Sequence, residues 1–242
     1  MVDKRKDERG DKLKHAKGAS QLVKKVNVPK AVVRQTPDLP STFDEAMEAG
    51  SLFEERTLQL EEQLVKGVRV EGLDFSTCRL EACAFDTVAM PRSILRSAKW
   101  KDVRFTNCDL ANCKILGLEA VRVEMVGCRT TGMEAVQSEW QSLLIQGGDQ
   151  RYAQFRFAKF HATEFEDCDF EDADFHGADL TGCVFRRCNL KNAELHKAKL
   201  AGTDLRGSQV EGLRIGAEDL AGAIVDVGQA LAFAPLLGIR IL

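Results

Sequence analysis

The sequence predicts an all-β fold, a narrow coil that turns a corner every five residues. Of the 33 positions from Val65 to Val225 whose number is a multiple of five, 29 hold Val, Leu, Ile, Met, Phe or Trp. Of the 14 glycines between residues 65 and 225, 12 lie two positions after such a residue. Neither a helix nor a plain strand has a period of five. Short turns must therefore interrupt the chain at regular intervals.

Each unit of five residues is typical of a short strand followed by a corner. The residue at the multiple of five, the central position, is preceded two places earlier by a small residue such as Ala173, Ala178 or Cys183, the small position. The residue between them is polar, as in Asp174 and Asp179. This alternation directs the small and central side chains to one side of the strand. Two places after the central residue, the corner position needs a positive φ, which glycine adopts without a Cβ clash.

Four such corners close a square coil of 20 residues. Successive coils can then stack by backbone hydrogen bonds, with small and central side chains inside. Residues 120–150 lose the motif at several units, yet Phe105 and Phe155 stay in the same phase. We therefore predict degenerate coils there in place of two separate domains, and a bulging corner at Gly147 and Gly148 stays open.

The units "ADFHG", "ADLTG", "CNLKN", "AELHK" and "TDLRG", and earlier "CRLEA", "CAFDT" and "CDLAN", resemble the repeat A(D/N)LXX of the pentapeptide repeat proteins. The resemblance covers about residues 65–225. It implies a right-handed quadrilateral β-helix, a rod with four flat faces. Some members of this family inhibit or protect DNA gyrase by imitating duplex DNA, so the resemblance also implies that function as an alternative.

Three segments lie outside the expected rod of residues 65–225. Residues 1–40 hold 11 Lys or Arg and 5 Asp or Glu, which is typical of a basic, disordered tail. Residues 41–64 contain Thr42 and Glu45 in capping-box spacing and predict a short helical cap over the N-terminal end of the rod. Residues 226–242 are apolar, and two interpretations stay open: a cap over the last coil, or a segment that forms a homodimer.

Groups that could carry chemistry have simpler structural explanations. All eight cysteines stand at the small position, where free thiols act as small apolar residues: Cys78, Cys83, Cys108, Cys113, Cys128, Cys168, Cys183 and Cys188. His176 and His196 lie 20 residues apart, but two histidines alone are a weak metal signature. No catalytic or phosphate-binding motif is present. We predict that the chain is not an enzyme and needs no metal or cofactor.

The charged side chains on the outer faces are the remaining candidates for a functional surface. Eight acids form a candidate interaction surface without an intervening Lys or Arg: Glu164, Glu166, Asp167, Asp169, Glu171, Asp172, Asp174 and Asp179. The following coil reverses the sign, which weakens the comparison with a long, uniformly negative DNA duplex. The sequence favours a non-catalytic rod that binds an unknown protein partner, with a DNA-mimic modulator of gyrase or another topoisomerase as the alternative. Direct nucleic-acid binding is expected only through the basic N-terminal tail.

The expected location is the cytoplasm. The charged N-terminus lacks the apolar run of a signal peptide. The most apolar stretch, Ala230 to Ile239, is too short to span a bilayer.

Overall fold

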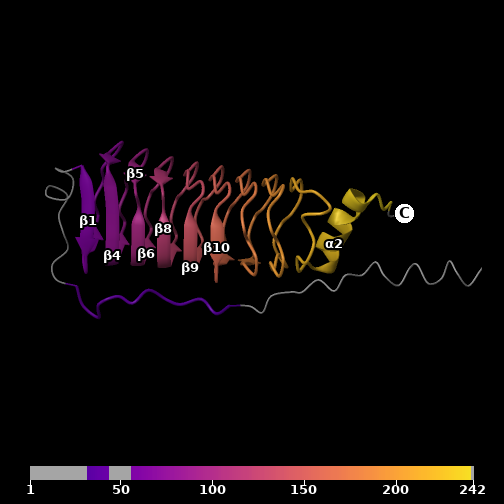
Figure 1. The fold of residues 1–242 in the computed structure, drawn as a ribbon, viewed down its shortest axis with the longest axis horizontal. Helices are drawn as coiled ribbons and strands as arrows, with labels where there is room; N and C mark the ends of the chain where they lie inside the picture. The colour runs from indigo at the N-terminus through magenta and orange to yellow at the C-terminus, as the bar shows by residue number, and fades with distance from the viewer. Residues whose placement is uncertain (1–31, 44–55, 241–242) are drawn as a thin grey trace, which may run out of the picture.

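The computed structural model describes residues 32–43 and 56–240, and its coils form a parallel β-solenoid (Figure 1). Isolated bridges continue the pairing beyond the last named strand, as far as Ile224. The predicted all-β coil is therefore confirmed. The elements are β1 (Thr57–Glu61), β2 (Leu64–Lys66), β3 (Asp74–Phe75), β4 (Thr77–Asp86), β5 (Ile94–Arg96), β6 (Lys99–Thr106), β7 (Lys114–Leu116), β8 (Glu119–Val126), β9 (Glu139–Gln146), β10 (Lys159–His161), β11 (Glu164–Glu166), β12 (Val184–Arg186), α2 (Val227–Phe233) and the 3-10 helix η2 (Ala234–Leu237).

The coils pair through residues that are 20 positions apart. Phe85 in β4 lies opposite Phe105 in β6, and Phe105 lies opposite Met125 in β8. One coil therefore takes 20 residues and has four sides. We number these sides so that the central residues of face 1 are multiples of 20, and those of faces 2, 3 and 4 follow five, ten and fifteen residues later. Strands β4, β6, β8 and β9 run through faces 1 and 2 and the corner between them.

The corners are β-turns whose third residue has a positive φ. After Phe175, the N–H of Ala178 donates to the Phe175 carbonyl over 2.9 Å, and Gly177 between them has a φ of 65°. Asn107 and Asn112 stand at the same position with φ values of 51° and 55°. Asparagine enters this region more readily than most residues other than glycine. The corner thus imposes its conformation on whichever residue occupies it.

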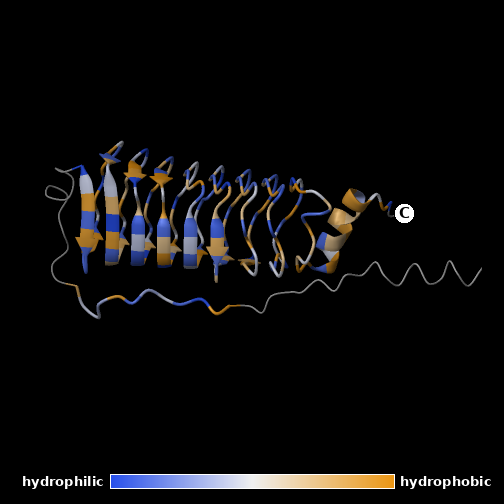
Figure 2. Ribbon diagram, in the orientation of Figure 1, coloured by the Kyte–Doolittle hydropathy of each residue, from blue (hydrophilic) through white to orange (hydrophobic). Residues whose placement is uncertain are grey.

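The central side chains meet on the axis of the rod. Phe165, Phe170 and Phe175 come from three successive faces, and their ring centroids lie between 5.2 and 6.4 Å apart. Phe165 also stacks on Phe185 of the next coil, with centroids 4.5 Å apart. Hydrophobic and hydrophilic residues alternate along the front strands because only one side of each strand faces this core (Figure 2). Each buried phenylalanine stabilises the fold by about 1.5–3 kcal/mol.

The irregular stretch of residues 120–150 keeps the register of the rod. Strands β8 and β9 pair with Glu119 opposite Glu139 and Val126 opposite Gln146. The predicted degenerate coils are therefore confirmed. The corner at Gly147 is distorted, because Gly148 also has a positive φ, of 89°, and a Cβ there would collide with the carbonyl oxygen of Cys128.

The coils begin earlier than the sequence analysis placed them. Strand β1 pairs with β4, with Leu58 opposite Cys78 and Leu60 opposite Leu80. It falls in residues 41–64, where a helical cap was expected. Residues 44–55 of that expected cap lie outside the described residues, whereas Thr57–Glu61 and Leu64–Lys66 are strands and not helix. The sequence did not predict this coil, because Leu58 places a large residue at the small position.

Residues 32–43, which we call the strap, lie along the outside of the rod (Figure 1). Their first part belongs to the segment expected to be a basic tail, of which residues 1–31 lie outside the described residues. Pro37 is buried. The Arg34 guanidinium lies 3.0 Å from Glu124, and the Asp38 N–H donates to Asp102 over 2.8 Å.

Helix α2 lies against the end of the last coil. Asp226 caps it and accepts a hydrogen bond from the N–H of Gln229. The buried Gln229 side chain donates to the carbonyls of Leu205 and Ser208, over 2.6 and 2.7 Å. These bonds give partners to carbonyls that have no further coil above them. Within the described part of the chain, no helix is long and apolar enough to cross a membrane.

Candidate interaction surfaces

The wall of the rod buries all eight cysteines, and none of them forms a disulfide. Burial raises the pKa of the Cys78 thiol to about 11 and that of Cys113 to about 12. The thiolate is the reactive form of cysteine, so Cys78 and Cys113 are poor nucleophiles at neutral pH. They fill the small position, as the sequence predicted.

The eight acids of the candidate interaction surface form a belt around one coil and not a single acidic face. They follow the chain around three faces and on to face 1 of the next coil. Glu164 and Glu166 lie on face 2, Asp169 and Glu171 on face 3, Asp174 on face 4 and Asp179 on face 1, with Asp167 and Asp172 at corners. A partner that approaches one face therefore meets only part of the belt.

Cations of neighbouring coils pair with much of this belt. Arg187 lies 2.7 Å from both Asp167 and Glu166, and Lys199 lies 3.0 Å from Asp179. The hydrogen bond from Arg187 lowers the pKa of Asp167. Two looser pairs join Arg151 to Asp169 at 3.7 Å and Arg156 to Asp174 at 3.6 Å. The net negative potential of the belt is therefore much smaller than its eight carboxylates suggest.

Several of these acids have a structural role that the sequence analysis missed. The Asp174 carboxylate accepts a hydrogen bond from the N–H of His176 over 2.8 Å, and Asp179 accepts one from Thr181 over 3.2 Å. Asn189 accepts the equivalent bond from the residue two places on. The side chain thus gives a partner to an N–H at the start of the corner. This bond explains why Asp or Asn recurs before the central residue.

His176 and His196 have different neighbours. The His176 ring meets Phe157 edge-on, with centroids 5.5 Å apart. His196 Nδ1 lies 2.6 Å from a carboxylate oxygen of Glu194. Among residues 32–43 and 56–240, no group of three or more His, Cys, Asp or Glu side chains is arranged to hold a metal ion.

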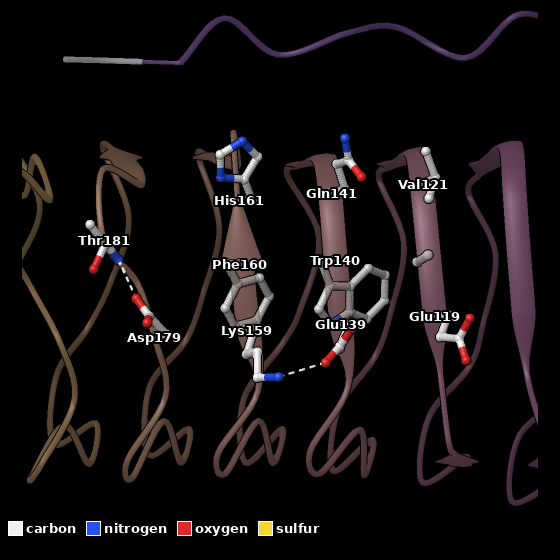
Figure 3. A pocket seen from close by; sticks show the side chains of 11 residues that line it. Glu119, Val121, Glu139, Trp140, Gln141, Lys159, Phe160, His161, Asp179 and Thr181 are labelled. Atoms are coloured by element: carbon white, nitrogen blue, oxygen red, sulfur yellow. Dashed lines mark hydrogen bonds and ion pairs between the residues drawn. The ribbon is translucent and has the colours of Figure 1, made fainter. Parts of the chain in front are cut away.

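A groove of about 550 Å³ lies on face 1 (Figure 3). Trp140 and Phe160 are among its lining residues, and Lys159 and His161 flank Phe160 along β10. Its charges are paired along the rod: Lys159 lies 2.6 Å from Glu139, and the partner of Asp179 is Lys199. The groove is therefore an electrically balanced part of the outer surface.

Four large apolar side chains are exposed on the described part of the rod, and all of them lie on face 4 or its two corners. Leu116 and Val136 occupy equivalent positions in successive coils, with exposed fractions of 39% and 36%. Phe157 and Tyr152 stand at the two corners of the next coil and are 48% and 55% exposed. We call these four residues the face-4 patch. The sequence analysis missed it, although all four residues stand one or two places after a central position, where side chains point outward.

The C-terminal segment also exposes apolar side chains. They lie on α2, on η2 and just beyond: Val227, Leu231, Leu236, Leu237 and Ile239 are between 43% and 79% exposed. Phe233 is buried within the same segment. The segment therefore contributes to the core with one side chain and presents others to solvent.

Comparison with solved structures finds partial similarity at low identity. A trypsin-treated form of QnrB1, a plasmid-mediated fluoroquinolone resistance protein, is 15% identical, with a TM-score of 0.36 over 74% of this chain and 98% of that one. HetL, a pentapeptide repeat protein involved in heterocyst differentiation regulation in the cyanobacterium Nostoc sp. strain PCC 7120, is 18% identical, with a TM-score of 0.30 over 72% of this chain and 90% of that one. Rfr23, a pentapeptide repeat protein of the cyanobacterium Cyanothece 51142, is 15% identical, with a TM-score of 0.22 over 67% and 91%.

No curated protein matches the chain. A family model does: the one described as pentapeptide repeats matches residues 151–187 and 168–207, in eight copies. The same five-residue period, with a positive φ at every corner except Thr77 and Ala217, extends along the rod from Glu62 to Gly222. Residues 151–207 of the chain therefore consist of pentapeptide repeats, and the rest of the rod continues their period.

Proposed function

We propose that the chain is a non-catalytic protein-binding rod and that the face-4 patch is where it contacts a partner protein. The single observation that carries this proposal is that the exposed large apolar residues of the described rod gather on one face. Isolated exposed apolar residues are common on soluble proteins, but a contiguous group indicates a binding surface.

Backbone strain at two members of the patch supports the proposal. Tyr152 and Phe157 have φ values of 59° and 56°, although bulky residues rarely adopt this region. Corners of neighbouring coils hold Gly132 and Gly177 at the equivalent positions. The strain of about 1–3 kcal/mol per residue is not offset by full burial of either ring. Recognition by a partner gives a reason for aromatic residues at these corners.

The surroundings of the patch suit a protein partner. Arg151 pairs with Asp149 at 2.8 Å next to Tyr152, and Arg156 lies 3.6 Å from Asp174 next to Phe157. An apolar centre with a charged rim is typical of specific protein interfaces, in which aromatic side chains carry much of the affinity. The expected partner therefore presents an apolar side chain that fits between Tyr152 and Phe157.

Affinity capture with matched variants tests this proposal. The bait is the full chain, and the extract comes from cells that naturally contain it. Phe157→Ala and Val136→Asp should each reduce the retained partner at least tenfold, since truncation of a hot-spot residue costs about 2 kcal/mol or more and about 1.4 kcal/mol is tenfold in affinity. The control is Lys159→Ala, which shortens an exposed side chain on face 1.

A protein retained by the parent chain and by K159A, but lost with F157A and V136D, would be the partner of this face. If all four baits retain the same proteins in the same amounts, the face-4 patch has no binding role. Thermal unfolding of each bait distinguishes loss of contact from loss of fold.

The alternative is a DNA-mimic modulator of gyrase or another topoisomerase. Its support is the belt of eight acids, and the ion pairs of that belt with Arg187 and Lys199 count against it. A mimic needs negative potential along the rod, spaced as phosphates are. A gyrase supercoiling assay separates the two proposals, because a rod that binds another protein should leave supercoiling unchanged at micromolar concentration.

We also propose that the exposed residues of the C-terminal segment pair two copies of the chain. Leu231 and Leu237 are 53% and 62% exposed, more than a cap over one coil needs. Light scattering on the full chain should give the mass of a dimer, and Leu231→Asp with Leu237→Asp should give that of a monomer. A monomeric parent chain would exclude this pairing.

A further inference from the structure

The strap follows the corner between faces 1 and 2, where the rod carries two buried carboxylates. Asp102, at the corner itself, is 4% exposed, and Glu124, on face 2 of the next coil, is 6% exposed. The strap supplies a donor to each: the guanidinium of Arg34 to Glu124 at 3.0 Å, and the N–H of Asp38 to Asp102 at 2.8 Å. We call this surface, formed by Asp102, Arg122 and Glu124, the strap corner.

Each carboxylate also has an arginine partner within the rod. Arg122 donates two hydrogen bonds of 2.5 Å to Asp102, and Arg104 donates to Glu124 over 2.9 Å. Burial by itself would raise the pKa of Asp102, but the hydrogen bonds from Arg122 and from the Asp38 N–H lower it. If the strap leaves, both acids keep a cation and gain access to water. Loss of an ion-pair partner is most unfavourable when it leaves a buried charge without compensation. Departure of the strap leaves no such charge.

The strap itself is held by few groups. Arg34 is largely buried with 15% of its side chain exposed, and Pro37 is buried between the two tied positions. In contrast, Val33 is 86% exposed and Val32 is 52% exposed. The residues that hold the strap form a short motif: Arg34, a proline three positions later, and then a residue whose backbone N–H donates to the rod. The residue before a proline favours extended backbone, which suits a peptide bound along a surface.

We propose that the strap corner is a docking site for an extended segment of a partner protein, one with an arginine and a proline three residues later, and that the strap occupies this site in the free chain. Such a segment would place its guanidinium on Glu124 and a backbone N–H on Asp102, as the strap does. A second copy is a weaker occupant, since its own strap already reaches its own corner. The strap then lowers the affinity for the partner by the fraction of time for which it covers the site.

This inference is independent of the face-4 patch, because the two surfaces lie on different faces of the rod. Failure of one leaves the other standing.

Fluorescence anisotropy with a labelled peptide of residues 32–43 tests the inference on the full chain. The variant Arg34→Ala removes the charged tie of the attached strap but leaves the strap corner intact. The labelled peptide should bind R34A at least tenfold more tightly than the parent chain. The matched control, Arg206→Ala, removes an exposed arginine that pairs with Asp204 at 2.7 Å elsewhere on face 2, and it should behave as the parent.

Two further arms test the chemistry of the site. A labelled peptide that carries Arg34→Glu should bind the R34A chain no more tightly than it binds the parent chain. Glu124→Gln in the R34A chain should also abolish the gain in affinity, because the amide keeps the shape of the side chain but not its charge. Circular dichroism melts establish that each variant remains folded.

Three results would overturn the inference: equal affinity of the peptide for R34A and the parent chain, retention of the gain with E124Q, or no binding of the peptide to any variant. Light scattering on R34A could give a fourth result that would overturn the inference. A dimer that the free peptide dissociates would show that a second copy, and not a partner protein, takes the vacated corner.

Discussion

Phe157 lies over Gly177 of the next coil, so that a Cβ added to Gly177 would stand 2.5 Å from Cδ1 of the Phe157 ring. Glycine at this corner therefore does two things. It adopts a φ of 65° without strain, and it gives the exposed ring a surface to lie on.

A double-mutant cycle separates these two roles. Gly177→Ala should lower the free energy of unfolding by about 1 kcal/mol for the positive φ and by a further ~1 kcal/mol for displacement of Phe157. In a Phe157→Ala background the second loss should disappear, which gives a coupling energy of about 1 kcal/mol. Urea unfolding of the four proteins measures it.

Gly182→Ala is the control for this cycle. Gly182 has a φ of 72° and no heavy atom within 4 Å of an added Cβ. Gly182→Ala should lower the free energy of unfolding only by the contribution from the positive φ, and it should show no coupling to Phe157→Ala. Equal coupling of both glycines to Phe157 would mean that the ring contact has no energetic effect.

The core contains a polar residue whose replacement should stabilise the fold. Thr130 is fully buried at a central position, and its hydroxyl has no hydrogen-bond partner among the described residues. Valine has nearly the same shape and no hydroxyl. Thr130→Val should raise the free energy of unfolding by about 1 kcal/mol, because a buried polar group without a partner is unfavourable by ~1–3 kcal/mol.

Thr203→Val provides the opposite case at another buried threonine. The Thr203 hydroxyl donates to the carbonyl of Leu180 over 2.7 Å. Its removal should lower the free energy of unfolding by about 1 kcal/mol. Thermal melts of the two variants should shift in opposite directions, and shifts of the same sign would contradict the assignment of hydrogen bonds in the core.

The sequence predicted the local geometry of the rod well because that geometry repeats. The period of five located the corners even where Asn107 or Phe157 replaces glycine, and the structure gives both a positive φ. Once a coil of 20 residues is accepted, the pair of Asp167 and Arg187, 20 positions apart, also follows from the sequence. The acidic belt could therefore have been recognised from the sequence as a set of ion pairs between coils.

Contacts without a period could not be predicted in this way. Arg34 and Glu124 are 90 positions apart, and Asp38 and Asp102 are 64 apart, so neither separation is a multiple of the 20-residue coil. Composition described residues 1–40 only as basic. The first coil was missed for a related reason, since Leu58 breaks the rule that a small residue precedes the central one.

The aspartate before the central residue should act through its oxygen and not its charge. Asp174→Ala removes the acceptor for the His176 N–H and should lower the free energy of unfolding by about 1 kcal/mol. Asp174→Asn keeps an acceptor at the same place and loses only the exposed pair with Arg156, worth ~0.2–1 kcal/mol. Chemical denaturation should therefore rank the parent above D174N and D174N above D174A. Equal loss in both variants would assign the effect to charge.

Acid should weaken the rod partly through Asp149. The hydrogen bond from Arg151, at 2.8 Å, lowers the pKa of Asp149 to about 2 in the folded chain, whereas an unfolded aspartate titrates near ~3.9. Because the folded pKa is the lower one, the ionised pair stabilises the fold above about pH 4, and this contribution is lost as the pH falls from about 4 towards 2. Solvent screens the half-exposed pair, so the contribution should stay under about 1 kcal/mol.

The test is the difference in unfolding free energy between the parent chain and Asp149→Asn at a series of pH values. The parent should be the more stable protein at pH 6, and its advantage should shrink steadily between pH 4 and pH 2, because asparagine does not titrate in this range. Arg151→Gln, which removes the cation but keeps Asp149, should abolish most of the same pH dependence. A difference that stays constant from pH 6 to pH 2 would show that Asp149 stabilises the corner as a hydrogen-bond acceptor alone, without a contribution from its ionisation.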